Sequence, residues 1–273
     1  MSRQAFDILA PHYDATFTAS RTGSYLRQRA RNRLYSHLKP GDVVLELGCG
    51  SGEDALWLAQ HHIRVIATDA SVEMLRLTRA KTAHTGLVRV EQLELDNLPA
   101  RFPPSDADRT PLFDAVLANF GPLNCLNDWR PLADWLATRV RPGGIAAFGI
   151  MSRYCLWEIV WHGLHGNIRH AIRRLGGKAQ FRVPGDKPNK PMEIHYPTVR
   201  RLERDFAPWF RRVGLMPLGL ALPPSDVYPV IERRPRLCVR LMALEEWLSS
   251  ASWLAQLADH YWIEFERIGY GSP

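Results

Sequence analysis

The sequence predicts an α/β fold with a doubly wound, mostly parallel seven-stranded sheet. Short apolar runs alternate with amphipathic helical stretches across residues 40–152, which is typical of parallel strands joined by helical crossovers. A glycine-rich turn, "ELGCGSGED" at residues 46–54, directly follows the first of these runs. An N-terminal helical cover and a helical lid, inserted after strand 5 and between strands 6 and 7, complete the expected architecture.

Composition points to a globular protein without a membrane span. The chain has 273 residues, of which 46% are hydrophobic and 23% are charged. No apolar run approaches the roughly 18–20 residues that a transmembrane helix needs, and the first residues lack the pattern of a signal peptide. The four cysteines (Cys49, Cys125, Cys155 and Cys238) are far apart, as in reduced thiols. We expect a cytoplasmic protein with neither a disulfide nor a metal site.

The elements of the first half follow from hydrophobic periodicity. Residues 22–38 place Leu26, Ala30, Leu34 and Leu38 four residues apart, which predicts an amphipathic helix. Ser71 is the expected N-cap of a later helix. The other expected helices and strands, in chain order, are strand 42–47, helix 53–62, strand 63–68, helix 71–84, strand 88–95, strand 113–120, helix 129–140 and strand 145–151.

After residue 152 the alternation stops. We expect one helical stretch at 154–175, a loop at 176–192 rich in Gly, Pro and Lys, and a final strand at 260–268 whose Trp262, Glu264 and Glu266 face is the wetter one. Between them we expect a helix at 198–210, a sixth strand at 211–222 and mostly helical residues at 224–258. The expected domains are an N-terminal cover (1–39), a core (40–152), an inserted lid (153–197) and the end of the sheet (198–273) with its insertion (224–258).

The glycine turn does not fit a dinucleotide. Gly48, Gly50 and Gly52 leave Glu53 where the dinucleotide pattern has its third glycine. The next helix opens with Glu53 and Asp54, and two carboxylates there would repel a pyrophosphate. They would not repel a ligand that carries an ammonium and a sulfonium, which favours S-adenosylmethionine.

Polar residues follow the other predicted strands. Asp69 ends the second strand, where a carboxylate can accept both ribose hydroxyls, and Asp96 follows the third, within reach of an adenine amino group. Asn119 and Phe120 end the fourth, beside the expected position of the reactive methyl. Ligands of open parallel sheets bind at the carboxyl ends of the strands, so these residues are expected at one site.

In this order, "VLELGCGSGED", "VIATDASVEML", "ELDNLP", "FDAVLANFGPLNCL" and "RPGG" resemble class I S-adenosylmethionine-dependent methyltransferases over about residues 40–152. "FDILAPHYDATF" upstream is similar to the small-molecule and quinone-type branch. The resemblance implies S-adenosylmethionine as cofactor and S-adenosylhomocysteine as product. The cofactor-binding residues that it implies, with Tyr13 covering the site, are Tyr13, Glu46, Gly48, Cys49, Gly50, Gly52, Asp69, Ala70, Met74, Asp96, Asn97, Asn119 and Phe120.

The acceptor site is less defined. His195 and Tyr196, at the predicted junction of lid and sheet, are candidates for a general base, and Asn124 could orient a polar group of the substrate. Trp157, Trp161 and His165 are candidates for an acceptor pocket, although the tryptophans could equally form the core of the lid.

We therefore expect methyl transfer to a small, partly apolar metabolite, with N, O, S or C as the acceptor atom. Residues 153–212 carry 13 Lys or Arg against 5 Asp or Glu, a net charge of +8, and this raises alternatives. One is a lipid or membrane-associated substrate methylated at the membrane surface, with weak peripheral contact. Others are an RNA methyltransferase and a non-catalytic S-adenosylmethionine-binding protein. No RNA-binding module is apparent, so nucleic acid is not the expected partner, and the oligomeric state stays open.

Overall fold

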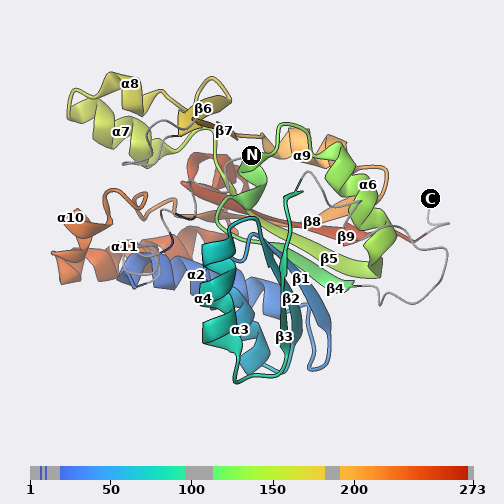
Figure 1. Ribbon diagram of the computed structural model, residues 1–273. Helices are drawn as coiled ribbons and strands as arrows, with labels where there is room; N and C mark the ends of the chain where they lie inside the picture. The colour runs from blue at the N-terminus through green and yellow to red at the C-terminus, as the bar shows by residue number, and fades with distance from the viewer. Residues whose placement is uncertain (1–6, 8–9, 11–18, 96–112, 182–190, 270–273) are drawn as a thin grey trace.

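The computed structural model describes residues 7, 10, 19–95, 113–181 and 191–269. Its main sheet has seven strands in the order β3-β2-β1-β4-β5-β9-β8 (Figure 1). The first five pair in parallel, whereas β9 runs antiparallel to both β5 and β8. The predicted seven-stranded, mostly parallel sheet is therefore confirmed. The strands are β1 (Val43–Leu47), β2 (Arg64–Asp69), β3 (Val88–Gln92), β4 (Phe113–Ala118), β5 (Val140–Met151), β8 (Phe210–Leu218) and β9 (His260–Arg267).

Helices cover both faces of this sheet. One face packs against α2 (Arg21–Tyr35), α3 (Glu53–Gln60) and α4 (Val72–Thr82). The helix α2 buries Leu26, Ala30 and Leu34, as the four-residue spacing predicts. The Oγ atom of Ser71 accepts a hydrogen bond from the backbone of α4, which confirms the predicted N-cap.

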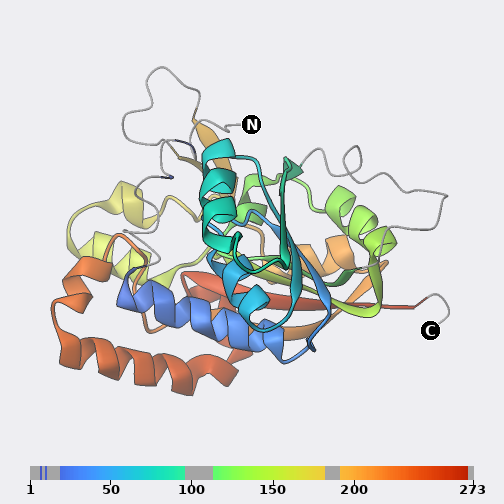
Figure 2. The ribbon, with the colours of Figure 1, turned by 60° about the horizontal axis from the view of Figure 1, so that its bottom comes forward.

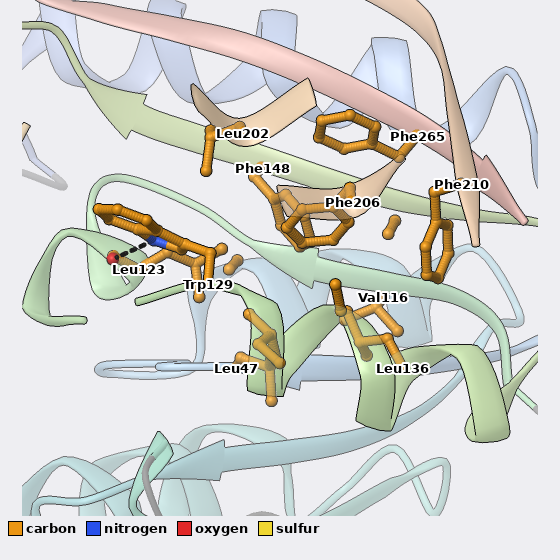
Figure 3. Packing of buried hydrophobic residues seen from close by; sticks show 14 of the residues in the cluster. Leu47, Val116, Leu123, Trp129, Leu136, Phe148, Leu202, Phe206, Phe210 and Phe265 are labelled. Carbon is orange, nitrogen blue, oxygen red and sulfur yellow. Dashed lines mark hydrogen bonds between the residues drawn. The ribbon is translucent and has the colours of Figure 1, made fainter. Parts of the chain in front are cut away.

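The opposite face packs against α6 (Arg130–Arg139) and α9 (Val199–Phe206). Figure 3 shows the aromatic part of this core, where Phe206 of α9 lies among rings of the sheet. Its ring stacks on Phe265 with centroids 4.6 Å apart, and Phe148 lies 5.6 Å away. Such pairs contribute beyond the area that they bury, so this layer fixes the position of β9 beside β5.

Two inserted segments lie at the end of the sheet where β4 and β5 finish (Figure 1). The first contains α7 (Leu156–Leu164), α8 (Ile168–Ala171) and a hairpin of β6 (Lys178–Phe181) and β7 (Met192–His195). The second contains α10 (Tyr228–Glu232), α11 (Pro235–Trp247) and two short 3-10 helices, η4 (Leu248–Ser250) and η5 (Ser252–Leu257). A further 3-10 turn, η3 (Pro122–Cys125), follows β4.

The structure corrects three expectations in the second half. The helical stretch 154–175 is broken, because Gly166 adopts a φ of +73° and Asn167 caps a separate helix α8. The expected loop 176–192 contains strand β6. The strand β5 begins at Val140 and so includes the turn residues that were expected to precede it.

The expected wetter face of the last strand is also wrong. Glu264 is fully buried, because α2 covers this face and its Arg33 forms two hydrogen bonds of 2.8 Å with the carboxylate. The Nε1 atom of Trp262 donates a third bond of 2.8 Å. A buried charge is tolerated when it is paired in this way.

Figure 2 shows α2 alongside α11 of the second insertion. The Tyr25 hydroxyl donates to the carbonyl of Met242, and Arg29 donates to the carbonyl of Glu245. The buried Glu245 carboxylate also accepts hydrogen bonds from two backbone N–H groups just after β8. The N-terminal helix is thus held by both the sheet and the second insertion.

We expect Arg33→Met to lower the free energy of unfolding by about 3 kcal/mol, because it leaves the buried Glu264 carboxylate without its cation. Chemical denaturation at pH 7 measures this. The control is Arg211→Met, which removes a more exposed ion pair with Glu266 on the same strand and should cost less than about 1 kcal/mol. Equal losses in the two variants would contradict the assigned role of the buried pair.

Candidate functional site

The glycine turn joins β1 to α3 in a conformation that needs glycine. Gly48 and Gly52 have φ values of +70° and +82°. A Cβ atom at Gly48 would lie 2.6 Å from the Pro122 side chain of η3, and one at Gly52 would lie 2.7 Å from Thr78 of α4. The turn is therefore packed between η3 and α4 at the carboxyl end of β1, as the predicted cofactor site requires.

Glu46 lies one residue before the end of β1 and presents an unsatisfied acceptor. Its side chain is buried, and its Oε2 atom has no hydrogen-bond partner within the described part of the chain. Burial raises the pKa of this carboxyl well above its usual range, and the negative charge of Asp54 raises it further. A buried acceptor of this kind is costly unless a donor reaches it, and a cationic ligand would supply that donor.

Asp69, at the end of β2, is held by the backbone. Its two carboxylate oxygens accept hydrogen bonds of 2.9 Å from the N–H groups of Gly50 and Ser71. Burial raises the pKa of Asp69, although these donors pull it in the opposite direction. Each carboxylate oxygen has a further lone pair, so the fixed carboxylate can still accept hydroxyl donors.

The two acidic residues that open α3 do not act as the sequence analysis expects. Asp54 is buried and contacts two arginines of α2, with an Nη1 of Arg27 at 2.6 Å and the Nε of Arg31 at 2.7 Å. Burial raises the pKa of Asp54, but the two guanidinium groups outweigh it and leave the pKa below its usual value. Glu53 pairs with Lys81 at 2.5 Å. Both carboxylates are thus paired with cations of the chain. Their expected repulsion of a pyrophosphate is therefore not a valid reason to exclude a dinucleotide.

The end of β4 lies beside this network. Asn119 donates to Asp54 over 3.0 Å, and its Oδ1 atom is buried without a partner among the described residues. Phe120 adopts a φ of +56°, which is unusual for a residue other than glycine and is typical of functional turns. The guanidinium of Arg27 lies 5.0 Å from its ring. The backbone is thus fixed where the methyl group is expected.

His260 is a residue that the sequence analysis missed. It is the first residue of β9, and its ring packs edge-on against Phe120 with centroids 5.5 Å apart. Its Nδ1 atom lies 3.0 Å from the carboxylate of Asp259, which also accepts a hydrogen bond of 2.9 Å from Arg174. Burial raises the pKa of Asp259, but His260 and Arg174 outweigh this and leave it far below its usual value.

An orienting carboxylate behind a histidine is the arrangement of a general base. The sequence feature that could have identified His260 is its place as the first residue of the last predicted strand. An antiparallel strand begins at the edge where its parallel neighbours end, so its first residue joins the site.

Three other predicted cofactor residues lie around the turn. Cys49 and Met74 are buried, and burial raises the pKa of the Cys49 thiol. The carbonyl of Ala70 accepts a hydrogen bond from Gln92. The expected residues Tyr13, Asp96 and Asn97 lie outside the described residues.

Asn124 of η3 uses its side chain to join main-chain segments. Its Nδ2 donates to the carbonyls of His195 and Met151, at 2.7 and 3.2 Å, and its Oδ1 accepts from the N–H of Met151 at 2.9 Å. This side chain thus holds the end of β5 against β7. Its contact with a substrate stays a prediction.

His195 and Tyr196 line a polar hollow of about 410 Å³. The basic residues around it are Arg153, Arg200, Arg201 and Arg204. Burial raises the pKa of Tyr196, against the opposing charge of Arg174. His195 ends β7 and Tyr196 follows it, next to the hydrogen bond between Asn124 and the His195 carbonyl. The catalytic role of both residues stays a prediction.

The candidate pocket residues of α7 pack inside the lid. Trp157 and Trp161 are half-buried against a small cluster of Val227, Ile231 and Cys238 from the second insertion. His165 is exposed, and its ring lies on that of Trp161. The tryptophans therefore join the two insertions, and their place in an acceptor pocket stays a prediction.

All four cysteines are free. Within the described ranges, every helix is too short or too polar to cross a bilayer.

Comparison with known proteins agrees with the geometry. Residues 44–144 match the methyltransferase domain family. An uncharacterised protein of Methanocaldococcus jannaschii is 28% identical over 190 residues, which cover 68% of this chain and 66% of that protein. The demethylmenaquinone methyltransferase of Corynebacterium urealyticum is 33% identical over 147 residues, which cover 54% of this chain and 58% of the enzyme. The chain thus spans less than two thirds of the length of either relative.

Among solved structures, an S-adenosylmethionine-dependent methyltransferase from Clostridium acetobutylicum superposes with a TM-score of 0.60 at 13% identity, covering 97% of this chain and 99% of that one. At this identity the likeness concerns the fold. The comparisons support S-adenosylmethionine as the cofactor. The buried acceptor of Glu46 and the fixed carboxylate of Asp69 suit its ammonium group and its ribose. The matched domain, the strand order and the glycine turn thus agree, and residues 44–144 form a methyltransferase domain.

Proposed function

We propose that this protein transfers a methyl group from S-adenosylmethionine to a small, partly apolar acceptor. The observation that carries the proposal is the unsatisfied, buried Oε2 of Glu46 beside a glycine turn that is itself hydrogen-bonded to Asp69. An ammonium group would satisfy Glu46, and a ribose would bring two hydroxyl donors to Asp69. A ligand with both groups fits this pair.

When bound, the cofactor supplies a methyl group on a positively charged sulfur. The chain's own part in the reaction is to align the acceptor, exclude water and remove a proton where the acceptor carries one. We place the methyl group beside Asn119 and Phe120. Tyr13 is proposed to cover the cofactor, and Asp96 and Asn97 to meet its adenine.

We propose His260 as the general base for a hydroxyl, thiol or amine acceptor. It lies against Phe120, and the ionised Asp259 faces its Nδ1. A proton on Nδ1 would leave the lone pair of Nε2 free to take the proton of the acceptor. Arg174 holds Asp259 from the opposite side and is a positioning residue.

The acceptor would approach from the inserted segments, which lie at the end of the sheet that holds these residues. The similarity to a demethylmenaquinone methyltransferase supports an aromatic, partly apolar acceptor. RNA is not the proposed acceptor, because no RNA-binding module is apparent in the sequence, and some arginines of residues 153–212 are oriented by ion pairs within the chain. Arg173 and Arg174 bind Glu158, and Arg201 binds Asp205.

A second candidate is an acceptor that is presented by a membrane surface. The first insertion exposes large apolar side chains beside basic ones, as interfacial helices do. The exposed apolar side chains of α7 and α8 are Leu156, Val160, Leu164 and Ile168.

For the cofactor, we expect Glu46→Gln to weaken S-adenosylmethionine binding about 10-fold or more, because a charge-assisted hydrogen bond becomes a neutral one. In the unmodified chain, affinity should fall as the pH drops through the raised pKa of Glu46, since the protonated acid cannot pair with the ammonium. Calorimetry across a pH series measures both effects. The variant should lose this pH dependence, and Glu203→Gln on α9 is the control. Binding of NAD in place of S-adenosylmethionine would reject the cofactor assignment.

For the base, we expect His260→Asn to reduce turnover by about 10²–10⁴-fold while S-adenosylmethionine affinity changes little. Formation of S-adenosylhomocysteine is measured with a panel of quinols, phenols, thiols and amines. His84→Asn is the matched control, because His84 is exposed just after α4 and is not a candidate base. Full activity of the His260 variant on the best acceptor would exclude His260 as the base.

For the membrane candidate, the chain should co-sediment with vesicles that contain anionic lipid, and Leu164→Glu should abolish this. Leu164 is 82% exposed, so the change should not disturb folding. Val72→Glu on α4 is the control for adding a charge at an exposed apolar position elsewhere. No sedimentation of the unmodified chain would leave the soluble acceptor as the only candidate of the two.

A further inference from the structure

We propose that the two insertions share a binding site for a divalent transition metal ion, with zinc as the best match. Three side chains that are far apart in the sequence meet there. His162 comes from α7, His170 from α8 and Asp226 from the residues before α10. Their ligand atoms all lie within 4.8 Å of one another. The sequence analysis expects no metal, because the spacing of these residues fits no local metal motif.

The donor atoms lie close enough together to bind one metal ion. The Nε2 atom of His162 lies 3.0 Å from a carboxylate oxygen of Asp226, and the two imidazole rings are 4.0 Å apart between centroids. With zinc bonds of 2.0–2.1 Å, ligand atoms around one ion stand about 3.3 Å apart. Small side-chain rotations would close the remaining difference.

His170 provides an independent sign of a ligand. Its Nε2 atom is buried, yet it has no hydrogen-bond partner in the described ranges. The backbone N–H of the same residue donates to the side chain of Asn167, which caps α8 and anchors the backbone that carries the ring. Buried polar atoms are nearly always satisfied, and a metal ion would satisfy this one.

The surrounding charges are mixed. Arg173, two residues after α8, is held by Glu158 through two hydrogen bonds of 2.8 and 2.9 Å, and the carboxylates of Glu158 and Asp226 oppose its effect on His170. One carboxylate with two neutral imidazoles is a donor set that zinc and its neighbours accept, whereas calcium and magnesium prefer oxygen ligands alone. Three protein ligands would leave a fourth position for water.

The position of the site indicates a structural role. Outside it, the insertions meet through the apolar contacts of Trp157 and Trp161. A metal held by α7, α8 and the segment before α10 would fasten the lid. The site uses none of the residues proposed for cofactor binding or proton removal, so its test is independent of the methyl-transfer proposal.

The test is calorimetric titration of the chelator-treated full chain with zinc chloride in the absence of cofactor. We expect one zinc per chain, and a loss of affinity of at least about 10-fold in both His162→Ala and His170→Ala. His165→Ala is the matched control, because His165 is an exposed histidine beside the same helix, and its removal should leave affinity unchanged. Magnesium in place of zinc should give no binding.

A second measurement follows the lid itself. Zinc should slow amide hydrogen exchange in residues 156–171 and 226–232 of the unmodified chain and of His165→Ala, and not in His170→Ala. Far-UV circular dichroism establishes that each variant is folded. The proposal would be overturned if the unmodified chain bound no zinc, or if His162→Ala and His170→Ala bound zinc as tightly as the unmodified chain does.

Discussion

The buried carboxylate of Asp54 holds the cofactor end of the molecule together. Its oxygens meet Arg27 and Arg31 from α2 and Asn119 from the end of β4, while its own helix α3 begins at the glycine turn. A buried anion is costly unless it is paired, and each of these partners adds to the pairing of Asp54. This single side chain thus fixes the N-terminal helix, the turn and β4 relative to one another.

The remainder of the site is arranged around that junction. The same α2 carries Arg33 to the buried Glu264 of β9, so one helix ties together the first and last strands of the sheet. The last strand in turn brings His260 to Phe120. Pairing β9 between β5 and β8 therefore does two things. It completes the hydrophobic core with Phe265, and it places a histidine against Phe120, beside the proposed position of the methyl group.

Local sequence signals predicted most of the architecture. The spacing of Leu26, Ala30 and Leu34, the N-cap at Ser71 and the glycine turn each depend on nearby residues, and each is present in the structure. What failed depends on distant partners. The burial of Glu264 requires Arg33, which lies 231 residues away. The alternation of apolar and polar residues alone predicts a solvent-exposed face for that strand. The pairing of Asp54 with α2 and the meeting of His260 with Phe120 are likewise long-range contacts that periodicity does not encode.

The place of β9 in the sheet has a consequence for how the protein is made. Both neighbours of β9 precede it in the chain, so β8 cannot join the sheet until the last strand has been synthesised and has paired on both edges. Such non-local pairing is slow to form, because the long intervening chain must first be closed into a loop. On the ribosome, the segment with the glycine turn emerges well before His260 does. The residues proposed to bind the cofactor are therefore synthesised before the proposed base, and the two parts of the proposed site meet only once β9 has paired with β5.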